Sequence, residues 1–271
     1  MELLFILGGG VMMLMLIGAR PSTARQAAVA GGARVRTKLD EVFGGAHDYA
    51  PARPNEFPDA DPGFYQAANA ELNGAGFATL GDLEDLTLSR AYPTMRTFQR
   101  VYVDQGQLIR ACVYHLRTRG VMVGMLQVIR AAPRNLRLVE LVTESSTGHF
   151  LVTTNTGGLD RLDAPPSFAV ERLDPSTRPA AVAARHTARV REWLRAHPSY
   201  GPVGIATLED AIAGMQRVHV RVALYRAAQG GLSRDELERI KGGPLSPLDE
   251  EFLAHVQVPQ TAPPTAGKPD A

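Results

Sequence analysis

The residues that could carry chemistry in this 271-residue chain are few and widely spaced. Cys112 is the only thiol, and His115 follows it within the apolar run 108–116. A nucleophilic cysteine needs a base within hydrogen-bond reach, but side chains three residues apart on a strand point to opposite faces. The sequence therefore predicts no thiol–imidazole dyad, and Cys112 is interpreted as a buried structural cysteine.

Two further histidines, His186 and His219, lie on the apolar stripes of predicted helices. They could share a metal ion if those helices packed together. A second ligand four residues away on either helix would strengthen that idea. The positions four residues before and after each histidine hold no such ligand: Val182, Val190, Met215 and Ala223. We therefore expect core or interface histidines, with no metal site and no cofactor.

Motifs of the common enzyme classes are missing from the sequence. A lone cysteine excludes multi-cysteine zinc and iron–sulfur sites. The chain contains no G-x-S-x-G elbow, P-loop, dinucleotide fingerprint or H-E-x-x-H. The sequence thus assigns no catalytic residue, and a binding role is favoured over catalysis.

A pocket between the sheet and its helices is the alternative, with Tyr114, His115 or His149 at its mouth. Hydroxyl-rich turns at 145–149 and 153–158 could bind an anion through their N–H groups. The same residue types equally serve the backbone bonds of a tight turn. Both interpretations of the turns stay open.

Short runs rich in β-branched and aromatic residues must position these side chains. Each run has the length and composition of a strand, and tight turns at 104–107 and 145–148 indicate antiparallel pairing. We therefore predict an α+β fold built on an antiparallel meander of five or six strands. The runs span residues 78–86, 97–103, 108–116, 121–129, 136–144 and 149–155.

Helices are predicted to cover this sheet. One carries Phe64, Ala68 and Leu72 on a single stripe and stops near Gly74. The later helices are marked by prolines and capping residues at their first turns. They are a helix at 179–197, one after the N-cap Thr207 running to 229, one behind the capping box of Ser233 and Glu236, and one from Ser246 and Pro247 to 256.

The N-terminal run Leu3–Ala19 predicts a single transmembrane helix, because 17 uncharged residues span roughly 25 Å. Five basic residues follow it, which by the positive-inside rule places the bulk of the chain in the cytoplasm. These flanking residues are Arg20, Arg25, Arg34, Arg36 and Lys38. There are two alternatives: a cleaved signal peptide that exports the domain, and a helix without membrane contact.

Composition divides the chain into five parts. We expect an anchor at 1–19, a basic and then Pro-rich tether at 20–62, an α+β domain at 63–200, a helical extension at 201–256 and a disordered tail at 257–271. Beyond Lys38 the chain carries 24 basic and 27 acidic residues. A slightly acidic domain disfavours binding of nucleic acid, which needs a positive surface.

The stretch Glu71-Leu72-Asn73-Gly74-Ala75-Gly76-Phe77, continued by Thr79-Leu80-Gly81-Asp82, resembles a set of uncharacterised bacterial proteins. In that set the pattern E-L-x-x-x-G-F-x-x-L-G-D opens an α+β domain of unknown function, over about residues 63–200 here. The resemblance brings no catalytic residues.

The leading hypothesis is a membrane-anchored module that binds a protein partner. The alternatives are a small-ligand-binding or hydrolytic domain, or an exported form of the same domain.

Overall fold

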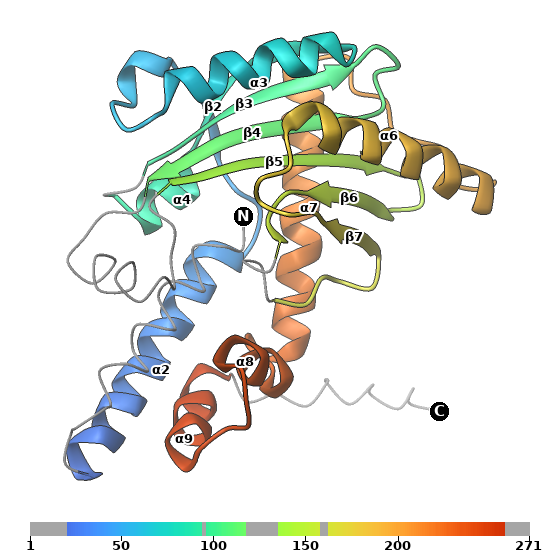
Figure 1. Cartoon of the computed structure of the whole chain (residues 1–271). Coiled ribbons are helices and arrows are strands. Elements are labelled where there is room, and N and C mark those ends of the chain that lie inside the picture. Colours follow the sequence, from blue (N-terminus) through green and yellow to red (C-terminus); the bar gives the residue numbers. More distant parts are fainter. Residues whose placement is uncertain (1–20, 94–95, 118–134, 158–161, 258–271) are drawn as a thin grey trace, which may run out of the picture.

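The computed structural model describes residues 21–93, 96–117, 135–157 and 162–257. Within these residues one seven-stranded sheet has the order β1-β2-β3-β4-β5-β6-β7 (Figure 1). Strands β1 to β6 pair antiparallel, and β7 pairs parallel to β6. The strands are β1 Tyr49–Pro51, β2 Phe77–Asp85, β3 Thr97–Asp104, β4 Arg110–Arg117, β5 Asn135–Glu144, β6 Phe150–Thr154 and β7 Phe168–Arg172.

This sheet corrects the predicted meander of five or six antiparallel strands, because it is mixed and has seven. Five of the predicted runs form β2 to β6, and the sixth, 121–129, lies outside the described residues. The two edge strands are additions. β1 has only three residues and β7 only five, too short for alternation to mark them in the sequence. β7 also follows Pro165 and Pro166, which read as a turn.

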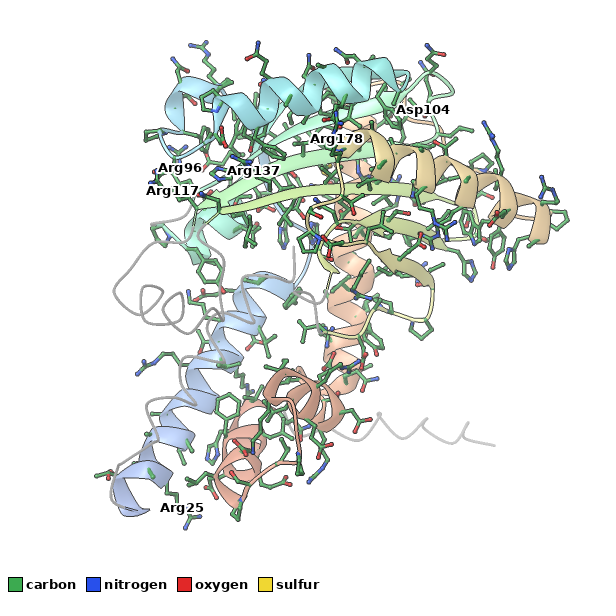
Figure 2. The ribbon with its side chains drawn as sticks, viewed as in Figure 1. Arg25, Arg96, Asp104, Arg117, Arg137 and Arg178 are labelled. Carbon is green, nitrogen blue, oxygen red and sulfur yellow. The ribbon has the colours of Figure 1, made fainter. Side chains whose placement is uncertain are left out.

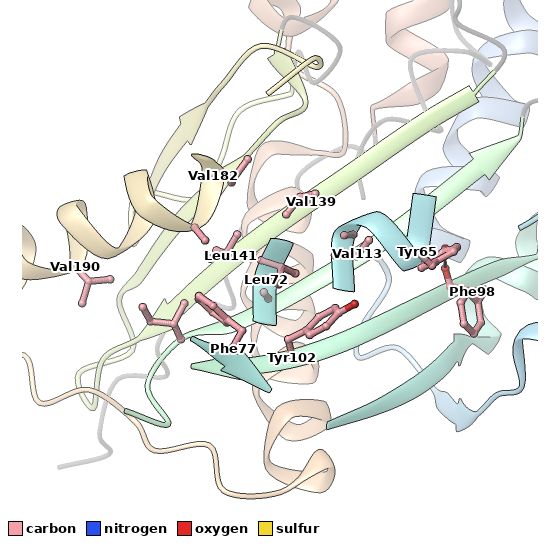
Figure 3. Packing of buried hydrophobic residues seen from close by; sticks show 14 of the residues in the cluster. Tyr65, Leu72, Phe77, Phe98, Tyr102, Val113, Val139, Leu141, Val182 and Val190 are labelled. Carbon is pink, nitrogen blue, oxygen red and sulfur yellow. Dashed lines mark hydrogen bonds between the residues drawn. The ribbon is translucent and has the colours of Figure 1, made fainter. Parts of the chain in front are cut away.

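Helices cover both faces of the sheet (Figure 1). α3 (Pro62–Gly74) and α6 (Pro179–Ala196) lie on one face, and α7 (Leu208–Gln229) crosses the other. Figure 3 shows the first core cluster, in which Leu72 of α3 and Val182 of α6 pack on Tyr102, Val113 and Val139 of the sheet. The side chains on the opposite face of β3, β4 and β5 pack against α7, so these three strands are buried on both faces.

A second core lies beside the sheet. It joins the N-terminal helix α2 (Pro21–Phe43) to α4 (Leu86–Ala91), α8 (Arg234–Lys241) and α9 (Pro247–Val256). α2 crosses α9 closely at Gly32, where a Cβ would lie 2.5 Å from the Phe252 carbonyl oxygen. The helix corrects the expectation that residues 20–62 form a tether with little regular structure. A single-turn 3-10 helix, Pro54–Glu56, is the other helical piece of that stretch.

The basic residues interpreted as membrane-flanking lie on α2, apart from Arg20, which is outside the described residues. Arg25, which is labelled in Figure 2, lies near the start of α2 and pairs with Glu251 of α9 at 3.3 Å. Lys38 donates to the Ala91 carbonyl oxygen at 2.8 Å. Arg34 is exposed and Arg36 half-buried. These cations thus belong to a helix that packs on protein.

The prediction of a transmembrane helix is also corrected. None of the helices that the structure describes combines the length and the apolar character needed to cross a bilayer. α2 and α7 have 23 and 22 residues, but each carries several arginines. The predicted run Leu3–Ala19 lies outside the described residues. The single-pass location at the cell membrane and the membrane as a partner, which depended on that helix, are corrected with it.

Capping residues set the ends of the C-terminal helices as predicted. Thr207, Ser233 and Ser246 each accept a hydrogen bond from a backbone N–H in the first turn, and each belongs to a complete capping box. The last residue of the described chain is 257, so the predicted disordered tail is outside it apart from that residue.

Ion pairs connect α3 to its neighbours through Arg137 and Arg178, which are labelled in Figure 2. Arg137 of β5 pairs with Asp61, the N-cap of α3, at 2.6 Å, and Arg178 before α6 pairs with Glu71 of α3 at 2.9 Å. These contacts fix the two helices on their face of the sheet. Exposed pairs of this kind each contribute about 0–1 kcal/mol.

Candidate functional site

A cavity of about 100 Å³ lies between the sheet and α7. The register places one row of residues across β4 to β7, in which Arg110 is followed by Val142, Val152 and Val170. α7 covers this row with side chains spaced three and four residues apart, which share one face of a helix. They are Met215, Val218 and Val222, and all of them line the cavity.

The neighbouring row supplies most of the polar lining. Cys112, Glu140, Thr154 and Arg172 follow one another across β4 to β7. Arg172 donates to the Leu162 carbonyl oxygen at 3.2 Å. Glu140 is half-buried and makes no hydrogen bond or ion pair within the part of the chain that the structure describes. The cavity therefore combines an apolar strip with a charged one.

Four buried polar atoms that face this cavity have no hydrogen-bond partner among the described residues. They are Nε2 of Gln99, Nε of Arg110, Oγ1 of Thr154 and Oγ1 of Thr156. Each residue is only 3–4% exposed. Buried polar groups in native proteins are nearly always hydrogen-bonded, to protein, water or ligand. An ordered water or a ligand in the cavity is therefore needed to bond these atoms.

Arg110 is held in place by α7. Its Nη1 donates to the Ala211 carbonyl oxygen at 3.3 Å. A Cβ on Gly214 would lie 2.6 Å from the same Nη1, so the glycine makes room for the guanidinium. The Nε–H has no hydrogen-bond partner among the described residues.

A stacked pair of imidazoles borders the cavity. The rings of His47 and His219 lie 3.6 Å apart at 7°. Tyr49 and His219 join through Oη and Nε2 at 2.8 Å, and both line the cavity. Burial lowers the pKa of His219 well below its usual value, and His47 lowers it further, so this ring is neutral at pH 7. Burial, and then Asp85, raise the pKa of Tyr49.

His47 does not itself line the cavity, and both of its ring nitrogens face acceptors. Nδ1 is 2.7 Å from Asp85 Oδ2, and Nε2 is 2.7 Å from the Val42 carbonyl oxygen. A carbonyl only accepts, so Nε2 carries a hydrogen and donates it to Val42, while Nδ1 faces the Asp85 carboxylate. Asp85 also caps α4 through Leu88 N–H at 2.9 Å. His47 and Asp85 therefore have a structural role, because their contacts join α2, β2 and α4.

His47, Asp85 and His219 each offer a ligand atom, and these atoms lie within 4.8 Å of one another. Metal ions bind an imidazole nitrogen in the plane of its ring at about 2.0–2.1 Å. Two nearly parallel rings 3.6 Å apart cannot both direct a nitrogen at one ion. In this arrangement the trio does not form a metal centre.

Cys112 lines the cavity without the properties of a nucleophile. Burial raises the pKa of its thiol to about 11, and Arg110 only partly opposes this. The sulfur lies 3.8 Å from Met215 Sδ. The thiol is thus protonated at neutral pH, and thiolate is the reactive form.

The structure separates the three residues predicted to border a pocket. Tyr114 lines the cavity. His115 points to the opposite face of the sheet, beside Phe64 at 6.5 Å between ring centroids. His149 lies in the turn after β5, where its ring stacks on Tyr200 at 4.6 Å. His115 and His149 therefore do not share a site with Tyr114.

His186 and His219 are also kept apart, because α6 and α7 lie on opposite faces of the sheet. His186 is fully buried against Thr143 and Thr153 at 3.0 and 2.8 Å. The turn at 145–149 uses its hydroxyls internally, since Ser145 Oγ accepts from His149 N–H at 3.0 Å. The anion-binding interpretation of that turn gains no support from these contacts.

Sequence reasoning missed Gln99, Arg110 and Glu140 as functional candidates. The alternation of the strands could have identified them. Each is a polar residue, and the residue two positions after it is apolar and faces α7, as Cys112 does after Arg110. A charged side chain at an inward position of a strand needs a partner, and that partner is not visible in the sequence.

The chain matches no protein-family model, and comparisons with curated proteins and with solved structures find no significant match. The resemblance at residues 71–82 stays a prediction, and the cavity is the feature on which a function can be argued.

Proposed function

We propose that this chain is a small-molecule-binding domain and that its ligand occupies the cavity between β4–β7 and α7. The four unpartnered buried polar atoms that face this cavity carry the proposal. Leaving such atoms unsatisfied costs about 1–3 kcal/mol each, and a ligand that bonds them recovers that free energy. A cavity with an apolar lining and a few polar groups is typical of a small-molecule site.

The size of the cavity limits the ligand. A dry cavity of about 150 Å³ admits benzene, which has six non-hydrogen atoms, so about 100 Å³ limits the ligand to a molecule no larger than that. A binding role also fits the chemistry of the lining, because the thiol and the phenol of Tyr49 both hold their protons. Neither group is available as a nucleophile at neutral pH.

The protein-interaction hypothesis has weaker support. The exposed large apolar side chains of the described residues are Val220 and Leu224, 40% and 61% exposed, one turn apart on α7. Stable interfaces bury about 800 Å² on each partner, far more than two side chains provide. Ligand binding is the function that the geometry favours.

A ligand-observed NMR screen tests the proposal. The panel holds acids, amides, alcohols and amines of up to about six non-hydrogen atoms, a limit set by the cavity. We expect at least one to bind the wild-type chain and to lose binding in Val218→Phe, which fills the cavity. Val220→Phe is the matched control, because Val220 is exposed on the same helix. Binding that survives Val218→Phe, or no binder in the panel, would refute the proposal.

A further inference from the structure

Two arginines among the described residues are almost fully buried, and they differ in their partners. Arg226 is 3% exposed and donates through Nη1 to Glu236 Oε1 at 2.5 Å. Arg110 is 4% exposed and has no carboxylate partner among the described residues. Its described hydrogen-bond partners, the Ala211 carbonyl and the Cys112 thiol, are both neutral. A buried charge is costly unless an opposite charge accompanies it.

Two acids lie diagonally from Arg110 in the register, Glu140 and Glu144, on either side of its partner Val142. Diagonal neighbours on a sheet are about 7–8 Å apart. Neither carboxylate forms a hydrogen bond or an ion pair with Arg110 among the described residues. Glu144 is instead paired with Arg217 at 2.7 Å, and its Oε2 lies 3.6 Å from the position that a Cβ on Gly214 would take. Glu140 is half-buried, so water reaches its charge, whereas the guanidinium of Arg110 is enclosed.

The surroundings of Arg110 form an apolar slot. From Arg110 the row continues through Val142, Val152 and Val170, and three strand spacings cover about 14 Å. α7 runs above the same row, from Gly214 at the guanidinium to Val222, about 12 Å further on. One end of the slot is therefore cationic, and its length is hydrocarbon.

We propose that the ligand is a short aliphatic monocarboxylate, with its carboxylate on Arg110 and its hydrocarbon chain along the valine row. This inference rests on the proposed function and names the ligand class for that site. A carboxylate supplies the charge that Arg110 lacks and accepts from its unpartnered Nε–H. A single buried guanidinium matches one negative charge, and the lining of valines and Met215 excludes water from a hydrocarbon chain.

Three probes of similar chain length test the charge of the ligand: butyrate, butyramide and butylamine. Their Kd values are measured by titration, followed through backbone amide shifts of the wild-type chain. We expect butyrate to bind at least about tenfold tighter than butyramide, because a hydrogen bond between charged groups is stronger than a neutral one. Butylamine should bind more weakly than either.

Two variants assign the effect to the slot. Arg110→Met removes the buried charge and should retain the fold, since replacing an uncompensated buried charge is not destabilising. We expect it to reduce the preference for butyrate over butyramide to about onefold. Glu140→Gln removes a negative charge near the slot and should tighten butyrate binding, whereas a ligand held by Glu140 would bind more weakly.

The outcomes separate this inference from the proposed function. If butyramide or butylamine binds as tightly as butyrate and Val218→Phe blocks them, the ligand class is wrong and the binding function stands. If butyrate binds equally to wild type and Arg110→Met, its carboxylate does not lie on Arg110 and the inference fails. If nothing binds in the slot, including the wider panel, both proposals fail.

Discussion

The buried imidazole of His186 makes the fold sensitive to acid. Burial, and secondarily Arg189, lower the pKa of this ring to about 3. The neutral ring is held between the hydroxyls of Thr143 and Thr153, one on each nitrogen. In the unfolded chain the pKa returns to about 6.5. Between these two values the unfolded state binds a proton that the folded state does not, so stability falls as the pH drops from about 6.5 towards 3.

The size of the effect follows from the two pKa values. Each pH unit within that window costs about 1.4 kcal/mol. Lowering the pH from 7.5 to 4.5 should therefore reduce the free energy of unfolding by about 2.5 kcal/mol through His186 alone. Carboxylates with a lowered pKa, such as Glu84 and Glu171, also make the folded chain less stable as the pH falls. A comparison of variants is needed to isolate the histidine.

Urea unfolding at both pH values makes that comparison. His186→Asn keeps a group that can bond a hydroxyl but does not titrate, so its loss between pH 7.5 and 4.5 should be about 2.5 kcal/mol smaller than that of wild type. The exposed His197, at the end of the same helix, is replaced by Asn as the control. Equal losses in wild type and His186→Asn would show that the ring does not stay neutral in the folded chain.

Two further predictions concern packing and reactivity. Gly32→Ala should destabilise the chain by about 1–2 kcal/mol in urea unfolding, because its Cβ would press on the backbone of α9 and overpacking outweighs the helix propensity gained. Gly74→Ala, whose Cβ meets open space in α3, should not destabilise the chain. Equal losses of stability in the two variants would contradict the close crossing of α2 and α9. Cys112 should resist iodoacetamide at pH 8 until urea unfolds the chain, since burial raises its pKa to about 11. Rapid labelling of the folded chain, followed by mass spectrometry, would be inconsistent with that burial.

Local signals predicted the elements whose stability is decided locally. Thr207, Ser233 and Ser246 mark helix starts because their hydroxyls bond the first-turn N–H groups wherever the helix then packs. The strands β2 to β6 follow from their composition and length. The turn between β3 and β4 is set by Asp104, whose carboxylate accepts from the N–H groups of Leu108 and Ile109.

Tertiary packing decides the elements that the sequence did not predict. α2 buries small residues such as Ala28 and Gly32 against α9, and these give little hydrophobic signal in the sequence. The partner of such a helix is more than 200 residues away. A separation of 104 residues likewise hides the candidate site, because Arg110 and Gly214 meet only once α7 has crossed the sheet.

The edges of the sheet bear on how the chain behaves at high concentration. An unpaired edge can recruit a strand from a neighbouring molecule and start aggregation. β1 offers only three residues and ends in Pro51, which has no N–H to donate. At the other edge, β7 is five residues long and includes Glu171 and Arg172, and charge opposes stacking of further strands. Both borders thus discourage polymerisation by strand addition.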